Sequence, residues 1–132
     1  MRGGENMIRG LESVLIGSQS AKKLAKFYRE VVGLKQGEVM EIGDEGEEGY
    51  EFKLKNTGLY IMDHSKVKGK SKQSERVMFN LEVSDIEKEV ARMKKAKAKV
   101  VQDIYHMQGY GYIATFEDPD GNYFQFVQVR AK

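Results

Sequence analysis

The chain has no cysteine among its 132 residues, which excludes disulfide bonds, thiol nucleophiles and thiolate metal ligands. No apolar run approaches the length of a membrane span, and no signal-peptide-like apolar segment precedes the first expected strand. The 22 Lys and Arg residues nearly balance the 20 Asp and Glu residues, so the charge does not indicate a nucleic-acid surface. We therefore expect a cytoplasmic protein with neither nucleic acid nor membrane as a partner, because the lack of cysteine also suits a reducing compartment.

The clearest local pattern in the chain is a strand, a tight turn and a second strand within residues 116–128. The only proline, Pro119, presets the backbone for a turn, and Gly121 tolerates the special angles that such a turn needs. After the turn the residues alternate, so Phe124 and Phe126 are expected to face a core. Gln125 then points to the opposite face of the sheet, towards whatever that face encloses.

The same order of elements is expected twice along the chain: a strand, a helix and three strands. In the first helix an apolar stripe begins at Leu24, with Ser20 as N-cap and Gly33 as the stop signal. In the second half, Ser84 and Glu87 are expected to form a capping box. The length predicts one domain, 8–132. The repeated order divides it into unit one at 8–64, a polar lysine-rich linker at 65–75 and unit two at 76–130. We expect strands at 8–16, 36–42, 50–55 and 59–64, then at 77–83, 100–105, 110–116 and 122–129.

Residues 1–6 are polar and are followed by Met7, so we interpret them as a frayed lead-in. Either Met1 or Met7 suits the native start. Aligning the two halves of the chain equates Ser13 with Met78, and Met62 with Gln125.

The helical segment Leu24–Leu34 and the motif Glu117–Asn122 before the last strand, together with the doubled pattern, resemble the vicinal-oxygen-chelate superfamily. This superfamily includes glyoxalase I, extradiol dioxygenases and bleomycin-resistance proteins. The resemblance implies an α+β fold in which two βαβββ units form curled mixed sheets around a cavity, with the helices on the outer face. It also implies a homodimer, in which paired units complete their cavities across a two-fold axis.

The resemblance also implies where a metal ion would bind, since ligands in the superfamily's metal enzymes come from the first and last strand of each unit. Those positions fall on Ser13, Met62, Met78 and Gln125 in this chain. None of the four is a histidine or a carboxylate, whereas a hard divalent cation needs several oxygen or imidazole donors with compensating charge. The missing carboxylate also removes the base that glyoxalase-type proton transfer would use. We therefore expect no metal cofactor.

Alternation places a mixed set of side chains on the inner faces of four strands. Apolar side chains with a few placed amides and hydroxyls are typical of a ligand pocket. The alternative is that Asn80 and Gln125 bond one another and the cavity is filled. The inner set comprises Ser13, Leu15, Tyr60, Met62, Met78, Asn80, Tyr123 and Gln125.

The two histidines each allow two interpretations. His64 shares the inner face with Tyr60, and would act there as a pocket acid, base or ligand, or would simply lie at the surface at the end of a strand. His106 lies within 105–112, together with Tyr110 and Tyr112. That segment either closes over a ligand or forms a hairpin with aromatic cross-strand pairs. The lysines of the linker would attract anions or only keep the linker solvated.

The sequence thus predicts a glyoxalase/bleomycin-resistance-like protein that binds a small molecule without a metal ion. The alternative is a lyase or dioxygenase-type metalloenzyme of the same superfamily that uses His64 or His106 as a non-standard ligand. Neither hypothesis identifies a catalytic residue or the ligand. The candidate ligand-binding residues are Ser13, Tyr60, Met62, His64, Met78, Asn80, His106, Tyr110, Tyr112, Tyr123 and Gln125.

Overall fold

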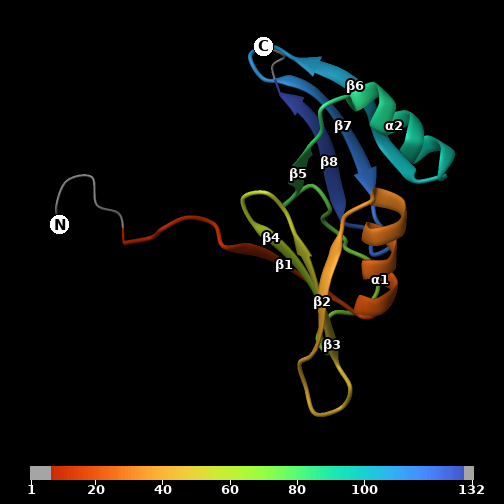
Figure 1. Ribbon diagram of the computed structural model, residues 1–132. Coiled ribbons are helices and arrows are strands. Elements are labelled where there is room, and N and C mark those ends of the chain that lie inside the picture. The colour runs from red at the N-terminus through yellow and green to blue at the C-terminus, as the bar shows by residue number, and fades with distance from the viewer. Residues whose placement is uncertain (1–6, 130–132) are drawn as a thin grey trace.

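A computed structural model describes residues 7–129, which form two modules of the same βαβββ design (Figure 1). In each four-stranded sheet the first strand pairs in parallel with the last, and the other pairs are antiparallel. The first module contains β1 (Ser13–Ser18), α1 (Ala21–Phe27), the π-helical turn η1 (Tyr28–Val32), β2 (Gln36–Glu41), β3 (Glu48–Lys53) and β4 (Gly58–Asp63). The second contains β5 (Phe79–Glu82), α2 (Ile86–Lys95), β6 (Lys99–Met107), β7 (Gly111–Glu117) and β8 (Tyr123–Val129).

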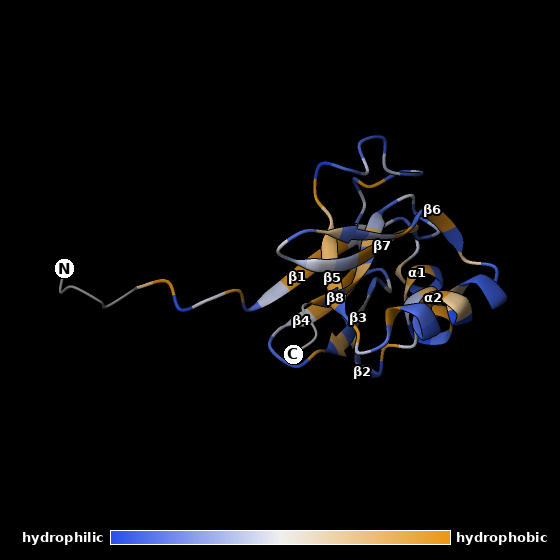
Figure 2. Ribbon diagram, turned by 90° about the horizontal axis from the view of Figure 1, so that it is seen from above, coloured by the Kyte–Doolittle hydropathy of each residue, from blue (hydrophilic) through white to orange (hydrophobic). Residues whose placement is uncertain are grey.

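This arrangement confirms the expected α+β fold, with strand orders β1-β4-β3-β2 and β5-β8-β7-β6 in two sheets that do not close. Both helices lie on the same side of the sheets (Figures 1 and 2), which leaves the opposite, inner face of each sheet uncovered by a helix. The expected lead-in at 1–6, a start at Met1 and the final residues 130–132 lie outside the described residues. No helix within residues 7–129 is long and apolar enough to span a membrane.

The first helix begins and ends as the sequence predicts. Ser20 has an extended backbone, and its side chain accepts a hydrogen bond from the Lys23 N–H at 3.4 Å. Gly33 ends the helix in the left-handed conformation, with φ of 97°, which costs glycine little. The carbonyl of Tyr28 accepts hydrogen bonds from the N–H groups of both Gly33 and Leu34, so the last turn is wound wider than an α-helix.

Two local expectations are wrong. The N-cap of α2 is Asp85 rather than Ser84, since the Asp85 side chain accepts from the Lys88 N–H at 3.1 Å. The first strand is shifted towards the C-terminus: pairing with β4 begins at Ser13 rather than at residue 8, and it continues past Gly17 to Ser18. Apolar character at Ile8 and Leu11 therefore does not indicate a strand here, and both side chains are exposed.

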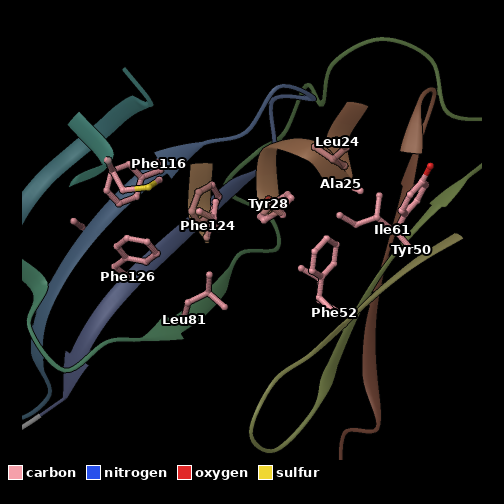
Figure 3. Close-up of a cluster of buried hydrophobic side chains, with 14 of the residues drawn as sticks. Leu24, Ala25, Tyr28, Tyr50, Phe52, Ile61, Leu81, Phe116, Phe124 and Phe126 are labelled. Atoms are coloured by element: carbon pink, nitrogen blue, oxygen red, sulfur yellow. The ribbon is translucent and has the colours of Figure 1, made fainter. Parts of the chain in front are cut away.

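The core fills the space between the helices and the outer faces of both sheets. Phe124 and Phe126 are buried in it, which confirms the alternation expected for β8. Figure 3 shows Tyr28 between a group from the first sheet and a group from the second. The ring of Tyr28 lies 5.4 Å from that of Phe124, centroid to centroid, so α1 and η1 cover part of the second sheet as well as their own.

The predicted turn after β7 joins the two modules. Asp118 is buried, and its Oδ2 accepts a hydrogen bond from the Tyr28 hydroxyl at 2.6 Å. Oδ2 of Asp120 accepts from the buried Ser18 hydroxyl, also at 2.6 Å. Gly121 takes the left-handed backbone expected of it, with φ of 80°. The motif that marks the family by sequence is therefore the point where module one meets module two.

A second contact between the modules comes from α2. Nη1 and Nη2 of Arg92 donate to the carbonyls of Val31 and Val32 at 2.7 and 2.8 Å. Those carbonyls lie at the end of η1 and have lost their helical partners. The Arg92 guanidinium, which belongs to α2, therefore caps the C-terminal end of η1.

Candidate functional site

A cavity on the inner face of the second sheet has a volume of about 460 Å³. Its walls come from β6, β7 and β8 and from residues before β5. Half of the lining residues are polar and half are apolar or aromatic. The polar lining residues are Glu75, Gln102, Thr115 and Gln125, and the others are Met78, Val101, Tyr105 and Tyr123.

A chain of directed hydrogen bonds crosses this face. The Thr115 hydroxyl donates to Oε1 of Gln125 at 2.7 Å, and Nε2 of Gln125 donates to Oδ1 of Asn80 at 2.9 Å. Nδ2 of Asn80 in turn donates to the hydroxyl oxygen of Tyr110 at 3.4 Å. The two amides do bond one another, yet the cavity beside them stays open. Because every bond runs in one direction, the Tyr110 hydroxyl keeps its own hydrogen for a further acceptor.

Three of the predicted residues, Met78, Tyr123 and Gln125, line the cavity, and Asn80 and Tyr110 are joined to it by hydrogen bonds. Sequence reasoning missed five lining residues. Thr115 was detectable, since it lies directly opposite Gln125 on the neighbouring strand. The three on β6 were not, because register shifts between Val100 and Tyr105 break simple alternation. The five are Glu75, Val101, Gln102, Tyr105 and Thr115.

The inner face of the first sheet carries a different set of side chains. Tyr60 lies between Leu15 on β1 and Glu51 on β3. Its hydroxyl donates to Oε2 of Glu51 at 3.2 Å, and that hydrogen bond is the main cause that raises the pKa of Tyr60. Leu15 is 61% exposed although it is apolar, so this face leaves hydrophobic surface in contact with solvent.

The two modules correspond with a spacing of 65 residues at their first strands, at the starts of their helices and at their last strands. Ala21 and Ile86 are the first residues of their helices, and their N–H groups donate to the side chains of Asp63 and Gln128 at the ends of β4 and β8. With this spacing Gln125 corresponds to Tyr60, not to Met62. The overlay inferred from the sequence was thus two residues out of register on β4, while Ser13 and Met78 remain equivalent.

Neither histidine lines the large cavity. His64 lies beside a separate hollow of about 210 Å³ that also borders Glu47 and Asp63, and its Nδ1 accepts from the Lys66 N–H at 3.1 Å. His106 pairs across the hairpin with Tyr112, at a ring distance of 4.9 Å. That pair matches the hairpin interpretation of the segment. Tyr105, next to His106, points instead into the cavity.

Comparison with known proteins identifies the family of this fold. A profile described as Glyoxalase/Bleomycin resistance protein/Dioxygenase superfamily matches residues 10–126. The chain belongs to this superfamily. No curated protein matches the chain by sequence. Because the superfamily includes both binding proteins and enzymes, membership does not by itself identify the activity.

Solved structures share the superfamily fold at low sequence identity. TnmS3, an antibiotic-binding protein from Streptomyces sp. CB03234, has a TM-score of 0.76 at 22% identity, covering 96% of this chain and 100% of its own. Leishmania major glyoxalase I has a TM-score of 0.73 at 20% identity, covering 92% and 87%. A glyoxalase I mutant from Zea mays has 0.77 at 20% identity, covering 92% of this chain and 46% of its own.

The residues at the positions where superfamily enzymes hold a metal ion do not fit one. With the corrected register these are Ser13, Tyr60, Met78 and Gln125, which supply no imidazole and no carboxylate. Within residues 7–129, no group of three or more His, Asp or Glu side chains is arranged to hold an ion. Oxygen-rich, charged coordination of a divalent cation is therefore not available at this position.

Proposed function

We propose that this chain binds a small organic molecule on the inner face of the second sheet, without a metal ion and without chemical turnover. The observation that carries the proposal is the position of Gln125. A metal site at this position would need a carboxylate side chain as a metal ligand. The Gln125 amide stands there instead, accepts a hydrogen bond from Thr115 and donates one to Asn80. These hydrogen bonds hold Thr115, Gln125 and Asn80 as a polar strip beside an open cavity. In it the amide makes neutral hydrogen bonds rather than contacts to a metal ion.

The cavity has the size and mixture expected for such a site. Its volume of about 460 Å³ is within the range of roughly 300–1,000 Å³ that small-molecule sites occupy. Tyr105 and Tyr123 offer faces for stacking, while Met78 adapts its shape to an irregular ligand. Similarity in fold to an antibiotic-binding protein is compatible with sequestration but adds only the fold.

The cavity is open on one side, and we propose that a homodimer completes it. Leu15 on the first sheet and Met78 and Tyr105 on the second are 61%, 38% and 37% exposed on inner faces. Uncovered apolar surface of this kind favours association. The alternative of a metalloenzyme that uses His64 or His106 has no geometric support, because neither imidazole reaches the cavity.

A direct test begins with elemental analysis of the protein purified without chelator. We expect no stoichiometric divalent metal, and a thermal-shift screen with and without zinc, nickel, iron and manganese should show no metal-specific stabilisation. The same screen against small metabolites should give ligands that raise the melting temperature by mass action. Near one metal ion per chain, lost on changing Ser13 or Gln125, would overturn the proposal.

A ligand from that screen should lose affinity when the polar strip is removed. Gln125→Leu keeps the size of the side chain but deletes both hydrogen bonds, so we expect about a fivefold to tenfold higher dissociation constant. Gln36→Leu, on edge strand β2 of the first sheet, is the matched control and should bind as the wild type does. Circular dichroism establishes that both variants are folded.

A further inference from the structure

The charge of the cavity is of one sign. Among residues 7–129, Glu75 is the only charged side chain that lines it, and no lysine or arginine of that part of the chain is among the lining residues. Within residues 7–129, the Glu75 carboxylate makes no hydrogen bond and no ion pair. A carboxylate without a partner at the edge of a cavity attracts a positive charge on whatever enters.

The walls beside Glu75 suit a cation with an apolar body. Tyr105 and Tyr123 line the same cavity, and the negative quadrupole of an aromatic face attracts a cation within about 6 Å. Met78 adds a polarisable thioether at the same wall. Gln125, Gln102 and Thr115 bring no charge, so none of the lining residues within 7–129 opposes a positive group.

The corresponding face of the first module is acidic too. Glu51 accepts a hydrogen bond from Tyr60; this bond and burial raise the pKa of that phenol most, and the charges of Glu51, Glu12 and Glu38 raise it further. These carboxylates surround the position that corresponds to Gln125. Any assembly that brings the two kinds of inner face together adds to the negative field in the cavity.

We propose that the cavity selects an organic cation: a flat or otherwise apolar molecule with a protonated amine, held with the amine at Glu75 and its body against Tyr105 and Tyr123. This inference rests on the proposed binding function and deepens it. Anionic molecules of the same shape bind least, because the unpaired carboxylate repels them. Neutral ones bind through the ring contacts alone and therefore more weakly.

Three acridines of one ring system provide the test: 9-aminoacridine, which is protonated at neutral pH, acridine, which is neutral, and acridine-9-carboxylate, which is an anion. Fluorescence titration of the full-length protein measures the three dissociation constants. We expect the cation to bind about tenfold more tightly than the neutral compound, and the anion to bind least. Because Glu75 is exposed, the preference for the cation should shrink as salt rises.

Glu75→Gln should weaken binding of 9-aminoacridine about threefold to fivefold and leave acridine unchanged. Glu87→Gln, on the exposed side of α2, is the matched control and should change neither. Equal affinities for the cation and the neutral compound, or the same loss of affinity in both glutamine variants, would overturn the inference while the binding function stands. If no acridine binds, the inference fails together with the proposed aromatic-lined site.

Discussion

The hydroxyl of Tyr28 donates a hydrogen bond of 2.6 Å to a carboxylate oxygen of Asp118, a residue 90 positions later in the chain. One partner belongs to the helical segment of the first module and the other to the turn of the second. Both are buried. Burial raises the pKa of Asp118, although four hydrogen bonds from Tyr28, Asn122 and Asp120 favour its ionised form. The relationship between the modules therefore depends on a small polar cluster in an apolar surrounding.

Removing the phenol hydroxyl tests this cluster. Tyr28→Phe keeps the ring among its aromatic neighbours but leaves one oxygen of a buried carboxylate with one donor fewer. We expect the free energy of unfolding to fall by about 1–3 kcal/mol, measured by urea denaturation. Tyr60→Phe is the control, because its hydroxyl meets a carboxylate at the surface, and it should cost less than about 0.5 kcal/mol. Equal losses of unfolding free energy in the two variants would show that the buried hydrogen bond stabilises the fold no more than the exposed one.

The carboxylate itself should be harder to replace. The two oxygens of Asp118 accept two hydrogen bonds each, from the Tyr28 hydroxyl, the Asn122 side chain and the N–H groups of Asp120 and Asn122. In Asp118→Asn one oxygen becomes an NH₂ group, which would face donors instead of accepting from them. We expect a larger loss than for Tyr28→Phe, about 2–4 kcal/mol, since two donors lose their acceptor. A variant as stable as the wild type would refute this account of the motif.

Alkaline unfolding should report the buried tyrosines. Burial is the main cause that raises the pKa of Tyr28 well above its usual value of 10 and that of Tyr50 to about 12. In the unfolded chain both phenols ionise near pH 10. Above that pH the unfolded state therefore binds fewer protons than the folded state, so stability is full below about pH 10 and falls as pH rises through the folded pKa values.

The urea midpoint measured between pH 8 and 12 should be flat at first and then decline. In Tyr28→Phe the decline should be shallower, because one of the two groups no longer titrates. Parallel curves for the variant and the wild type would contradict the assignment of the alkaline loss to Tyr28. The salt concentration is held constant, since surface lysines also lose their charge in this range.

The guanidinium that joins α2 to η1 gives a further prediction. Arg92 donates to the carbonyls of Val31 and Val32 at once, and a planar fork is needed to reach both. Arg92→Lys keeps the charge but loses this geometry, so we expect a loss of about 1 kcal/mol in the free energy of unfolding. Lys88→Arg, elsewhere on α2, should be neutral by the same measurement. A fully stable Arg92→Lys variant would show that charge alone is sufficient.

Much of the architecture follows from local patterns in the chain. Apolar spacing after Ser20 predicted α1, and alternation after Pro119 predicted that Phe124 is buried and that Gln125 faces the other way. These features depend only on neighbours in sequence. The start of β1 could not be predicted in this way, because it is set by the partner strand: pairing with β4 begins at Ser13 opposite Gly58.

The cavity was less accessible to sequence reasoning for two reasons. Register shifts in β6 turn Gln102 and Tyr105 to the same face, although they are three residues apart. The alignment that equates Met62 with Gln125 is two residues out of register, because β4 begins at Gly58 and β8 begins at Tyr123. The cavity residue Glu75 belongs to a segment that reads as polar linker. Its role depends on tertiary placement that no local pattern encodes.

Assembly gives the last prediction. Leu15 occupies the position that corresponds to Asn80, on the inner face opposite Tyr60, and is 61% exposed in the single chain. If inner faces meet across a two-fold axis, this side chain is buried in the homodimer, and light scattering should give near 30 kDa, twice the 15.1 kDa of one chain. Leu15→Asp places a charge in that contact and should shift the protein to monomers at micromolar concentration. Val39→Asp, on edge strand β2, also exposes a new carboxylate and should leave the dimer intact. A wild-type mass of one chain across a dilution series, or dissociation by both variants alike, would show that the inner faces are not the dimer contact.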